Sequence, residues 1–170
     1  MKMTSAYANK MIKKLNEDKD YWNNKEVNSY VYVVAMDEEP VVPDYDYSEV
    51  AAIIAEIDAR IATIRHAVNL FNTTNTIDVC GESLTIDCLL IKMAQLNQRK
   101  TFLDLMRKHQ PKARIESRSF GPRKAVPEYE VINYDLDLIK REYEEVNQKI
   151  AQMQLALDKY NQTVEFEVEI

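Results

Sequence analysis

Glycine is scarce in this chain of 170 residues, which contains only Gly81 and Gly121. The phosphate-binding P-loop, the dinucleotide fingerprint GxGxxG and the nucleophile elbow GxSxG each need glycines at positions where a Cβ would meet a phosphate or strain a turn. None of these motifs can be written with the two glycines present. Their absence excludes the enzyme classes that depend on such loops.

Cysteine and histidine are also rare, with 2 residues of each kind. The spacing of Cys80 and Cys88 fits neither a paired zinc motif nor a CxxC redox motif, which predicts reduced thiols in a cytoplasmic protein. Neither His66 nor His109 has a glutamate three residues before it, as the Glu-x-x-His element of di-iron bundles requires. We therefore expect no metal and no cofactor, and no residue has a sequence context that marks it as catalytic.

Long apolar runs are missing as well, so the sequence predicts neither a signal peptide nor a membrane span. The net charge of -6 argues against general binding to nucleic acid or to an anionic membrane, because both require a positive surface. An apolar content of 46% is sufficient for a real core. The length predicts a single domain over residues 1–170.

Helical periodicity is the strongest pattern present. Apolar residues at alternating steps of four and three predict long helices over about 4–25, 48–73, 85–109 and 135–161. Thr85 and Asp135 are candidate N-caps. The second and fourth helices carry matched apolar stripes, which indicate a coiled-coil-like seam in an antiparallel bundle. The seam residues are Val50, Ile54, Ile57, Ile61, Ile64, Val68 and Phe71, and Leu136, Ile139, Tyr143, Val146, Ile150, Met153, Leu157 and Tyr160.

Small residues occupy the rest of the second helix, where a solvated face would carry lysine and glutamate. They let another backbone approach closely, so we expect a second packing partner for this helix. The partner is another helix of the same chain or a neighbouring protomer, and we expect a homo-oligomer. The residues are Ala51, Ala52, Ala55, Ala59, Ala62 and Ala67.

Strand-like patterns lie between and after the helices. Residues 114–120 and 129–134 predict the arms of a hairpin over about 114–134, and alternation over 163–169 predicts a C-terminal strand. The aromatic and β-branched run Tyr30 to Met36 predicts a further strand, with continuation of the first helix as the alternative. Residues 72–83 read as a connection. The fold class is therefore α+β, with a small antiparallel sheet formed by the hairpin, the C-terminal strand and this run.

Several segments, spread from Pro43 to the C-terminus, together resemble a family of small bacterial proteins. They are Pro43 to Tyr47, Ile64 to Thr74, Leu84 to Asp87, Gln98 to Lys100, Asn133 to Asp135, Ala156 to Asp158 and Asn161 to Glu167. The family is sometimes labelled septicolysin-like and consists largely of uncharacterised helical-hairpin proteins. The resemblance implies long antiparallel helices with a small sheet. It carries no motif for a pore-forming segment.

A polar cluster is the best candidate for a ligand site. Arg65, Asn69 and Asn72 share one face near the end of the second helix, and Asp87 and Arg99 of the next helix could complete a pocket with them. Such a pocket would suit a small anionic or nucleotide-like ligand. In the alternative reading, which we favour, the asparagines end the helix while Arg65 pairs with an acid across the bundle.

Positive charge is concentrated between the third and fourth helices. The basic patch consists of Arg107, Lys112, Arg114, Arg118, Arg123 and Lys124, with Lys108 beside it and only Glu116 opposing it. Nucleic acid is an unlikely partner, because no aromatic residues or recognition motif interleave with these charges. We expect the patch to pack on the protein's own acidic surface. The candidates are Asp37, Glu38, Glu39, Asp44 and Asp46.

These patterns favour a non-enzymatic oligomeric scaffold or binding module. A small-ligand binding protein that uses the Arg65 and Asn69 face is the second reading, and an enzyme is the third.

Overall fold

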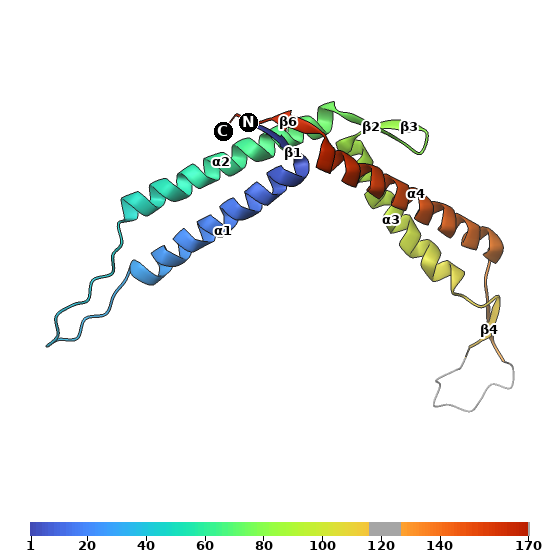
Figure 1. Cartoon of the computed structure of the whole chain (residues 1–170). Coiled ribbons are helices and arrows are strands. Elements are labelled where there is room, and N and C mark those ends of the chain that lie inside the picture. The colour runs from blue at the N-terminus through green and yellow to red at the C-terminus, as the bar shows by residue number, and fades with distance from the viewer. Residues whose placement is uncertain (116–126, 170) are drawn as a thin grey trace. The chain divides into compact units, whose positions relative to one another are not determined.

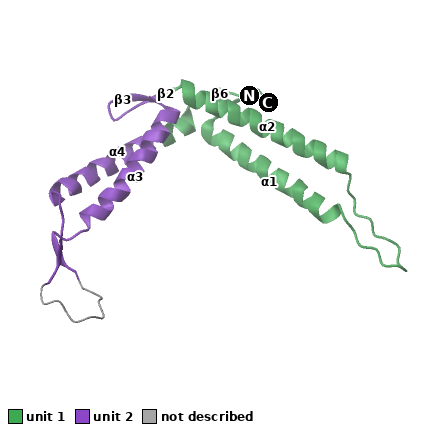
Figure 2. Ribbon diagram, turned by 180° about the vertical axis from the view of Figure 1, so that it is seen from behind, with its two compact units in different colours: residues 1–76, 157–170 green, residues 77–156 purple. Residues whose placement is uncertain are grey.

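The computed structural model describes residues 1–115 and 127–169, and the chain divides into two compact units. The first comprises Met1–Thr76 and Leu157–Ile170, and the second comprises Ile77–Ala156 (Figure 2). The described residues form four helices and three two-stranded sheets, so the α+β class is confirmed. Two helices lie in the first unit, and a third helix with most of the fourth lies in the second.

The first unit is built on the helical pair α1 (Ser5–Ser29) and α2 (Tyr47–Thr74), which run side by side (Figure 1). Both helices begin at capping residues. The Thr4 hydroxyl accepts a hydrogen bond from the Tyr7 backbone N–H at 3.2 Å, and the Asp46 carboxylate accepts one from the Glu49 backbone N–H at 3.0 Å. These contacts satisfy N–H groups that have no partner inside a helix.

The isoleucine stripe of α2 forms the core of this unit. Ile57, Ile61 and Ile64 cluster with Ala8 and Leu15 of α1, and each is buried. Lys19 of α1 donates to both oxygens of the Asp58 carboxylate at 2.7 Å beside this seam. The four-three pattern of α2 therefore faces α1, and its alanine residues remain largely outside the seam.

A two-stranded sheet joins the ends of the chain in the first unit. β1 (Lys2–Thr4) pairs antiparallel with β6 (Glu165–Glu167), with Lys2 opposite Glu167. Val168, next to β6, is 1% exposed, and Phe166 stacks on Phe71 at a centroid distance of 4.7 Å. The prediction that the C-terminal strand shares a sheet with the 114–134 hairpin was wrong, because the N-terminal strand takes that place.

The second unit begins with a hairpin that the sequence patterns did not indicate. β2 (Thr76–Val79) and β3 (Glu82–Thr85) are joined by Cys80 and Gly81, whose φ angles are 53° and 77°. Two successive positive φ angles are typical of the two-residue turn that matches the twist of paired strands. The predicted connection over 72–83 is thus the end of α2 followed by most of a hairpin.

The second unit also contains the helix α3 (Ile86–Arg107) and most of α4 (Leu136–Thr163), whose residues from Leu157 onward belong to the first unit. Buried side chains come from both helices, among them Leu89 and Leu103 of α3 and Ile139 of α4. The Lys100 ammonium donates to the Asn147 side-chain oxygen at 2.6 Å, which links the two helices. Asp135 caps α4 as predicted, by accepting from the backbone N–H groups of Asp137 and Leu138. Thr85 occupies the N-cap position of α3, but its hydroxyl makes no capping hydrogen bond.

Between these helices lies the ribbon of β4 (Lys112–Arg114) and β5 (Tyr129–Val131), with Arg114 opposite Tyr129. The predicted arms were longer, at 114–120 and 129–134. Residues 116–120 lie outside the described residues, and the second arm ends at Val131. No described strand outside the ribbon pairs with it.

The connection between α1 and α2, residues 30–46, is called the tip segment here. A strand or a continued helix was predicted over Tyr30 to Met36, and both were wrong, because α1 ends at Ser29 and this run pairs with no strand. The chain reverses near Ala35, whose carbonyl accepts from the Glu38 backbone N–H at 3.3 Å. The returning arm contains Pro40 and Pro43, which lack the N–H groups that a ladder requires.

Candidate functional site

The polar face at the end of α2 does not form a closed site with its neighbours in the first unit. Arg65 and Asn69 are exposed, and Asn72 is partly buried. The Asn69 backbone carbonyl accepts from the Thr73 hydroxyl at 3.2 Å, which is a local contact at the end of the helix. The helix continues past both asparagines to Thr74 and is capped by Asn75, whose backbone and side-chain N–H groups donate to the Phe71 carbonyl at 3.1 and 2.9 Å. Arg65 forms no ion pair among the described residues, so the structure shows neither the predicted ligand site nor the predicted ion pair here.

Asp87 and Arg99, the other two predicted ligand residues, belong to the second unit. The Thr85 hydroxyl donates to the Asp87 carboxylate, and this hydrogen bond is the main reason why the pKa of Asp87 is lowered. Arg99 of α3 pairs with Glu142 of α4 at 3.4 Å. Each side chain therefore has a structural partner within its own unit.

Residues 1–115 and 127–169 contain no group of three His, Cys, Asp or Glu side chains that lie closely enough together to hold a metal ion. Cys80 and Cys88 are free thiols. The Cys80 thiol donates to the Gln152 side-chain oxygen at 3.3 Å, which links the β2–β3 turn to α4. In the same part of the chain, no helix is long and apolar enough to cross a bilayer.

The basic patch begins in the last turn of α3, where its first charges are neutralised locally. Arg107 pairs with Asp104 at 2.8 Å, and Lys108 donates to the same carboxylate. These hydrogen bonds lower the pKa of Asp104, Lys108 contributing most, and the bond to Asp104 raises the pKa of Arg107. The Arg107 guanidinium also lies 3.8 Å from the centre of the Tyr143 ring. Arg107 thus fixes the end of α3 against α4.

Lys112 and Arg114 continue the patch along β4, and both are exposed. The Lys112 ammonium lies 4.3 Å from the centre of the Tyr129 ring, and neither side chain has an ion-pair partner among the described residues. Three further members, Arg118, Arg123 and Lys124, lie outside the described residues. Among the described members of the patch, the unneutralised charges are therefore Lys112 and Arg114 on the ribbon, and not Arg107 on α3.

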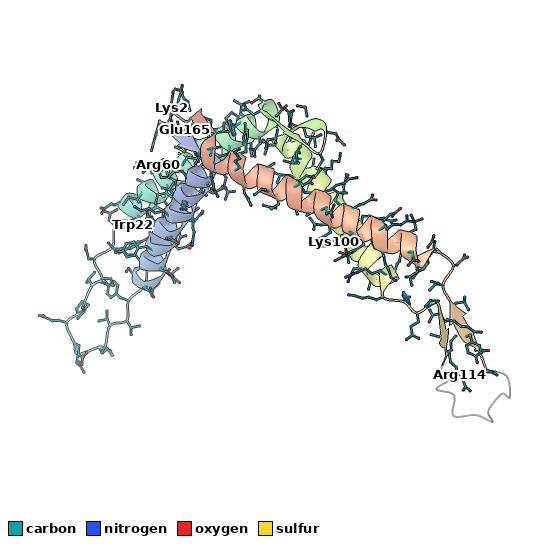
Figure 3. The ribbon with its side chains drawn as sticks, turned by 45° about the vertical axis from the view of Figure 1, so that its right-hand side comes forward. Lys2, Trp22, Arg60, Lys100, Arg114 and Glu165 are labelled. Atoms are coloured by element: carbon teal, nitrogen blue, oxygen red, sulfur yellow. The ribbon has the colours of Figure 1, made fainter. Side chains whose placement is uncertain are left out.

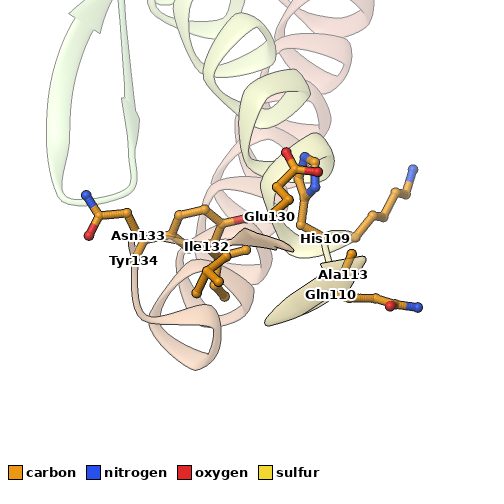
Figure 4. A pocket seen from close by; sticks show the side chains of 9 residues that line it. His109, Gln110, Ala113, Glu130, Ile132, Asn133 and Tyr134 are labelled. Atoms are coloured by element: carbon orange, nitrogen blue, oxygen red, sulfur yellow. The ribbon is translucent and has the colours of Figure 1, made fainter. Parts of the chain in front are cut away.

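A pocket of about 460 Å³ lies where the end of α3 meets the ribbon (Figure 4). Its lining combines Ala113, Val131 and Ile132 with the charged and polar residues Lys108, His109, Gln110, Glu130, Asn133 and Tyr134. The Tyr134 hydroxyl donates to the Met106 carbonyl at 2.7 Å and so holds the wall of the pocket against α3. This volume falls within the usual range for small-ligand sites.

Sequence reasoning missed this pocket, because its residues come from the end of α3, from the two short strands β4 and β5 and from the residues after β5, and share no period. The sequence signals available in this region were Pro111, which indicated the end of a helix, and Tyr134, which indicated the end of a strand. Neither indicated a pocket. The ligand residues predicted from helical spacing lie elsewhere. Only the basic patch, through Lys112 and its neighbours, directed attention to this region.

Comparisons with known proteins support the fold. No family model and no curated protein matches the chain. A crystal structure of a functionally unknown conserved protein from Corynebacterium diphtheriae is similar, with a TM-score of 0.62 over 98% of this chain and 100% of that one. The sequence identity is 15%, so the likeness concerns the fold alone. The septicolysin-like resemblance stays a prediction.

Proposed function

We propose that this chain is a non-enzymatic oligomeric scaffold or binding module of the bacterial cytoplasm. The observation that supports this most is the outward face of α2. At 100° per residue, the exposed alanines of α2 lie on the side of the helix opposite to the buried isoleucine stripe. They are Ala52, Ala55, Ala59 and Ala62.

The spacing of these alanines matches that of a coiled-coil seam. Steps of three, four and three residues place them in one row, which His66 and Leu70 extend toward the end of the helix. A face that only met water would carry charged residues, whereas alanine allows a second helix to pack at short range. We infer that this row, the alanine seam, packs on a second copy. The coiled-coil-like bundle expected from the sequence is then completed between copies.

Apolar surface on the second unit also supports association. Several large apolar side chains of α3 and α4 remain about half exposed or more and are available for contact with a partner. They are Leu90, Ile91, Phe102, Leu105 and Leu155. The free thiols of Cys80 and Cys88 fit a reducing compartment.

The seam is tested with variants of equal charge change. Ala55→Glu combined with Ala59→Glu adds two negative charges on the seam, and Arg60→Glu changes the charge by the same amount about 100° or more away from the seam. Glutamate is a good helix former, so both proteins keep their helical content. We expect light scattering to give a multiple of 19.8 kDa for the wild type and for Arg60→Glu, and 19.8 kDa for the seam variant. An unchanged mass for the seam variant would refute this use of α2.

A second candidate function is binding of a small anionic ligand, and the pocket at the end of α3 favours it. Lys108 and His109 line that pocket, and Lys112 and Arg114 lie on the adjacent strand. A thermal-shift screen of inorganic phosphate, small carboxylates and nucleotides tests this. A ligand at about a hundred times its dissociation constant stabilises by roughly 2.7 kcal/mol. Loss of the shift in His109→Ala, but not in Asn69→Ala, would assign the site to the pocket.

A further inference from the structure

The tip segment exposes an unusual amount of apolar surface at the far end of the α1–α2 pair (Figure 1). Every residue from Tyr30 to Val42 is exposed, and Val33 retains 95% of its accessible surface. The outgoing arm, Tyr30 to Ala35, has the composition of a strand but no strand partner among the described residues. Surface of this kind marks a site of interaction.

Hydrogen bonds fix the base of the tip segment to the ends of α1 and α2, so the outgoing arm projects from an anchored position. The Tyr45 hydroxyl donates to the Glu26 carboxylate at 2.8 Å, which joins the returning arm to the last turns of α1. Asp46 then caps α2. Pro40 and Pro43 disfavour a ladder in the returning arm, and no described strand lies in the tip, so the backbone groups of the outgoing arm have no ladder partner there.

Charge on the tip segment has one sign. It contains five acidic residues and no basic one, and four of them, Asp37, Glu38, Glu39 and Asp44, form no ion pair among the described residues. One face of the β4–β5 ribbon carries positive charge, which is complementary to the acidic tip segment. Lys112 and Arg114 form no ion pair among the described residues and share one face of the ribbon with Tyr129 and Val131, which remain about half exposed or more, whereas Glu130 lies on the other face (Figure 3 labels Arg114).

The ribbon also offers a free strand edge. Ala113 lies opposite Glu130, and the flanking hydrogen bonds, from Ile115 N–H to the Glu128 carbonyl and from Ile132 N–H to the Pro111 carbonyl, follow the same register. Since inward and outward backbone groups alternate in an antiparallel pair, those of Lys112 and Arg114 face the outer edge of β4. A strand added at this edge would therefore form its hydrogen bonds with the backbone groups of Lys112 and Arg114, whose side chains carry unpaired positive charges.

We propose that the outgoing arm of the tip segment of one copy adds as a strand to the outer edge of β4 of a second copy, with the tip acids beside Lys112 and Arg114. This deepens the proposed oligomeric function and rests on it. The occupant is a second copy because this chain itself supplies both an unpaired strand-like arm, followed directly by acidic residues, and a free strand edge that carries Lys112 and Arg114. The contact joins two different surfaces, so it extends the assembly beyond a pair related by the alanine seam.

Charge reversal in two separate proteins tests the proposal in the full chain. Asp37→Lys with Glu38→Lys reverses the tip, and Lys112→Glu with Arg114→Glu reverses the ribbon. Each protein alone then opposes like charges. We expect sedimentation velocity to show self-association at least about tenfold weaker than in the wild type for each, and wild-type association when the two proteins are mixed. The wild-type contact should also weaken as salt increases.

The possible results separate this inference from the proposed function. If both reversed proteins assemble like the wild type, the tip contact is refuted while the alanine seam stands. A wild type that is monomeric at every concentration overturns both. A third protein carries both reversals in one chain. If this protein associates like the wild type, but the mixture of the two singly reversed proteins does not, the tip contacts the ribbon of its own chain, and the proposed contact with a second copy is refuted.

The strand mode has its own test in proline substitutions at successive positions. Neighbouring N–H groups of a strand point in opposite directions, so either Val33→Pro or Val34→Pro must remove a ladder hydrogen bond. We expect at least one of them to weaken association at least about tenfold, and Val33→Ile, which keeps the β-branched apolar side chain, to leave it unchanged. Full association of both proline variants would refute strand addition.

Discussion

Removal of the C-terminal tail should destabilise the first unit strongly. Truncation before Val164 deletes β6, the half-buried Phe166 and the fully buried Val168. It also removes the two hydrogen bonds between Val168 and Met1, at 2.7 and 2.9 Å. Burial of a valine contributes about 1.5–3 kcal/mol and an aromatic stack about 0.5–1.5 kcal/mol, so the loss is roughly 2–4.5 kcal/mol.

That loss is large against a total stability of about 5–15 kcal/mol. At about 2–4 °C per kcal/mol for a chain of this size, circular dichroism should show a melting midpoint lower by roughly 4–18 °C. Glu167→Gln is the matched control, because it removes only the charge opposite Lys2 and should cost less than about 1 kcal/mol. Equal melting of the truncated and intact proteins would show that the tail is a free arm and refute its place in the core.

Three further changes test the core, the electrostatics and a turn. Ile57→Asp places a carboxylate in the buried seam and should cost several kcal/mol in urea unfolding, whereas Ile150→Asp, at a half-buried position, should cost less; equal losses would contradict the burial pattern. The pKa of Asp104 lies below its ordinary 3.8, so its ionised carboxylate stabilises the fold fully above that pH, and this stabilisation is lost as pH falls through the folded-state pKa. Asp104→Asn should therefore flatten the dependence of stability on acid pH. Parallel stability curves for the variant and the wild type would refute this. Gly81→Ala, at φ 77°, should lower stability by about 1–2 kcal/mol in thermal unfolding, and an unchanged midpoint would show that the turn relaxes.

The helices were the part of the fold most accessible from sequence, because their spacing is local. The stripe of Ile57, Ile61 and Ile64 indicated both the helix and its buried face, and Asp135 marked the start of α4. Strand pairing depends on contacts between distant residues, which periodicity does not report. The partner of the C-terminal strand is Lys2–Thr4, a run too short to carry a pattern of its own.

The tip segment shows how a local preference can be overridden. Tyr30 to Ala35 has strand composition, but Pro40 and Pro43 prevent its neighbouring arm from pairing with it. The Cys80–Gly81 turn was missed because its first residue is not one of those that usually adopt a positive φ. For the candidate site, sequence indicated the basic patch but not the pocket beside it, since the pocket is built from the end of α3 and from two short strands distant in the sequence.

Sedimentation equilibrium of the wild-type chain, from low to high micromolar concentration, tests the central claim of an oligomeric scaffold most directly. The account predicts a mass that is a multiple of 19.8 kDa and that rises with concentration as the tip contacts form. A single species of 19.8 kDa at every concentration would contradict it.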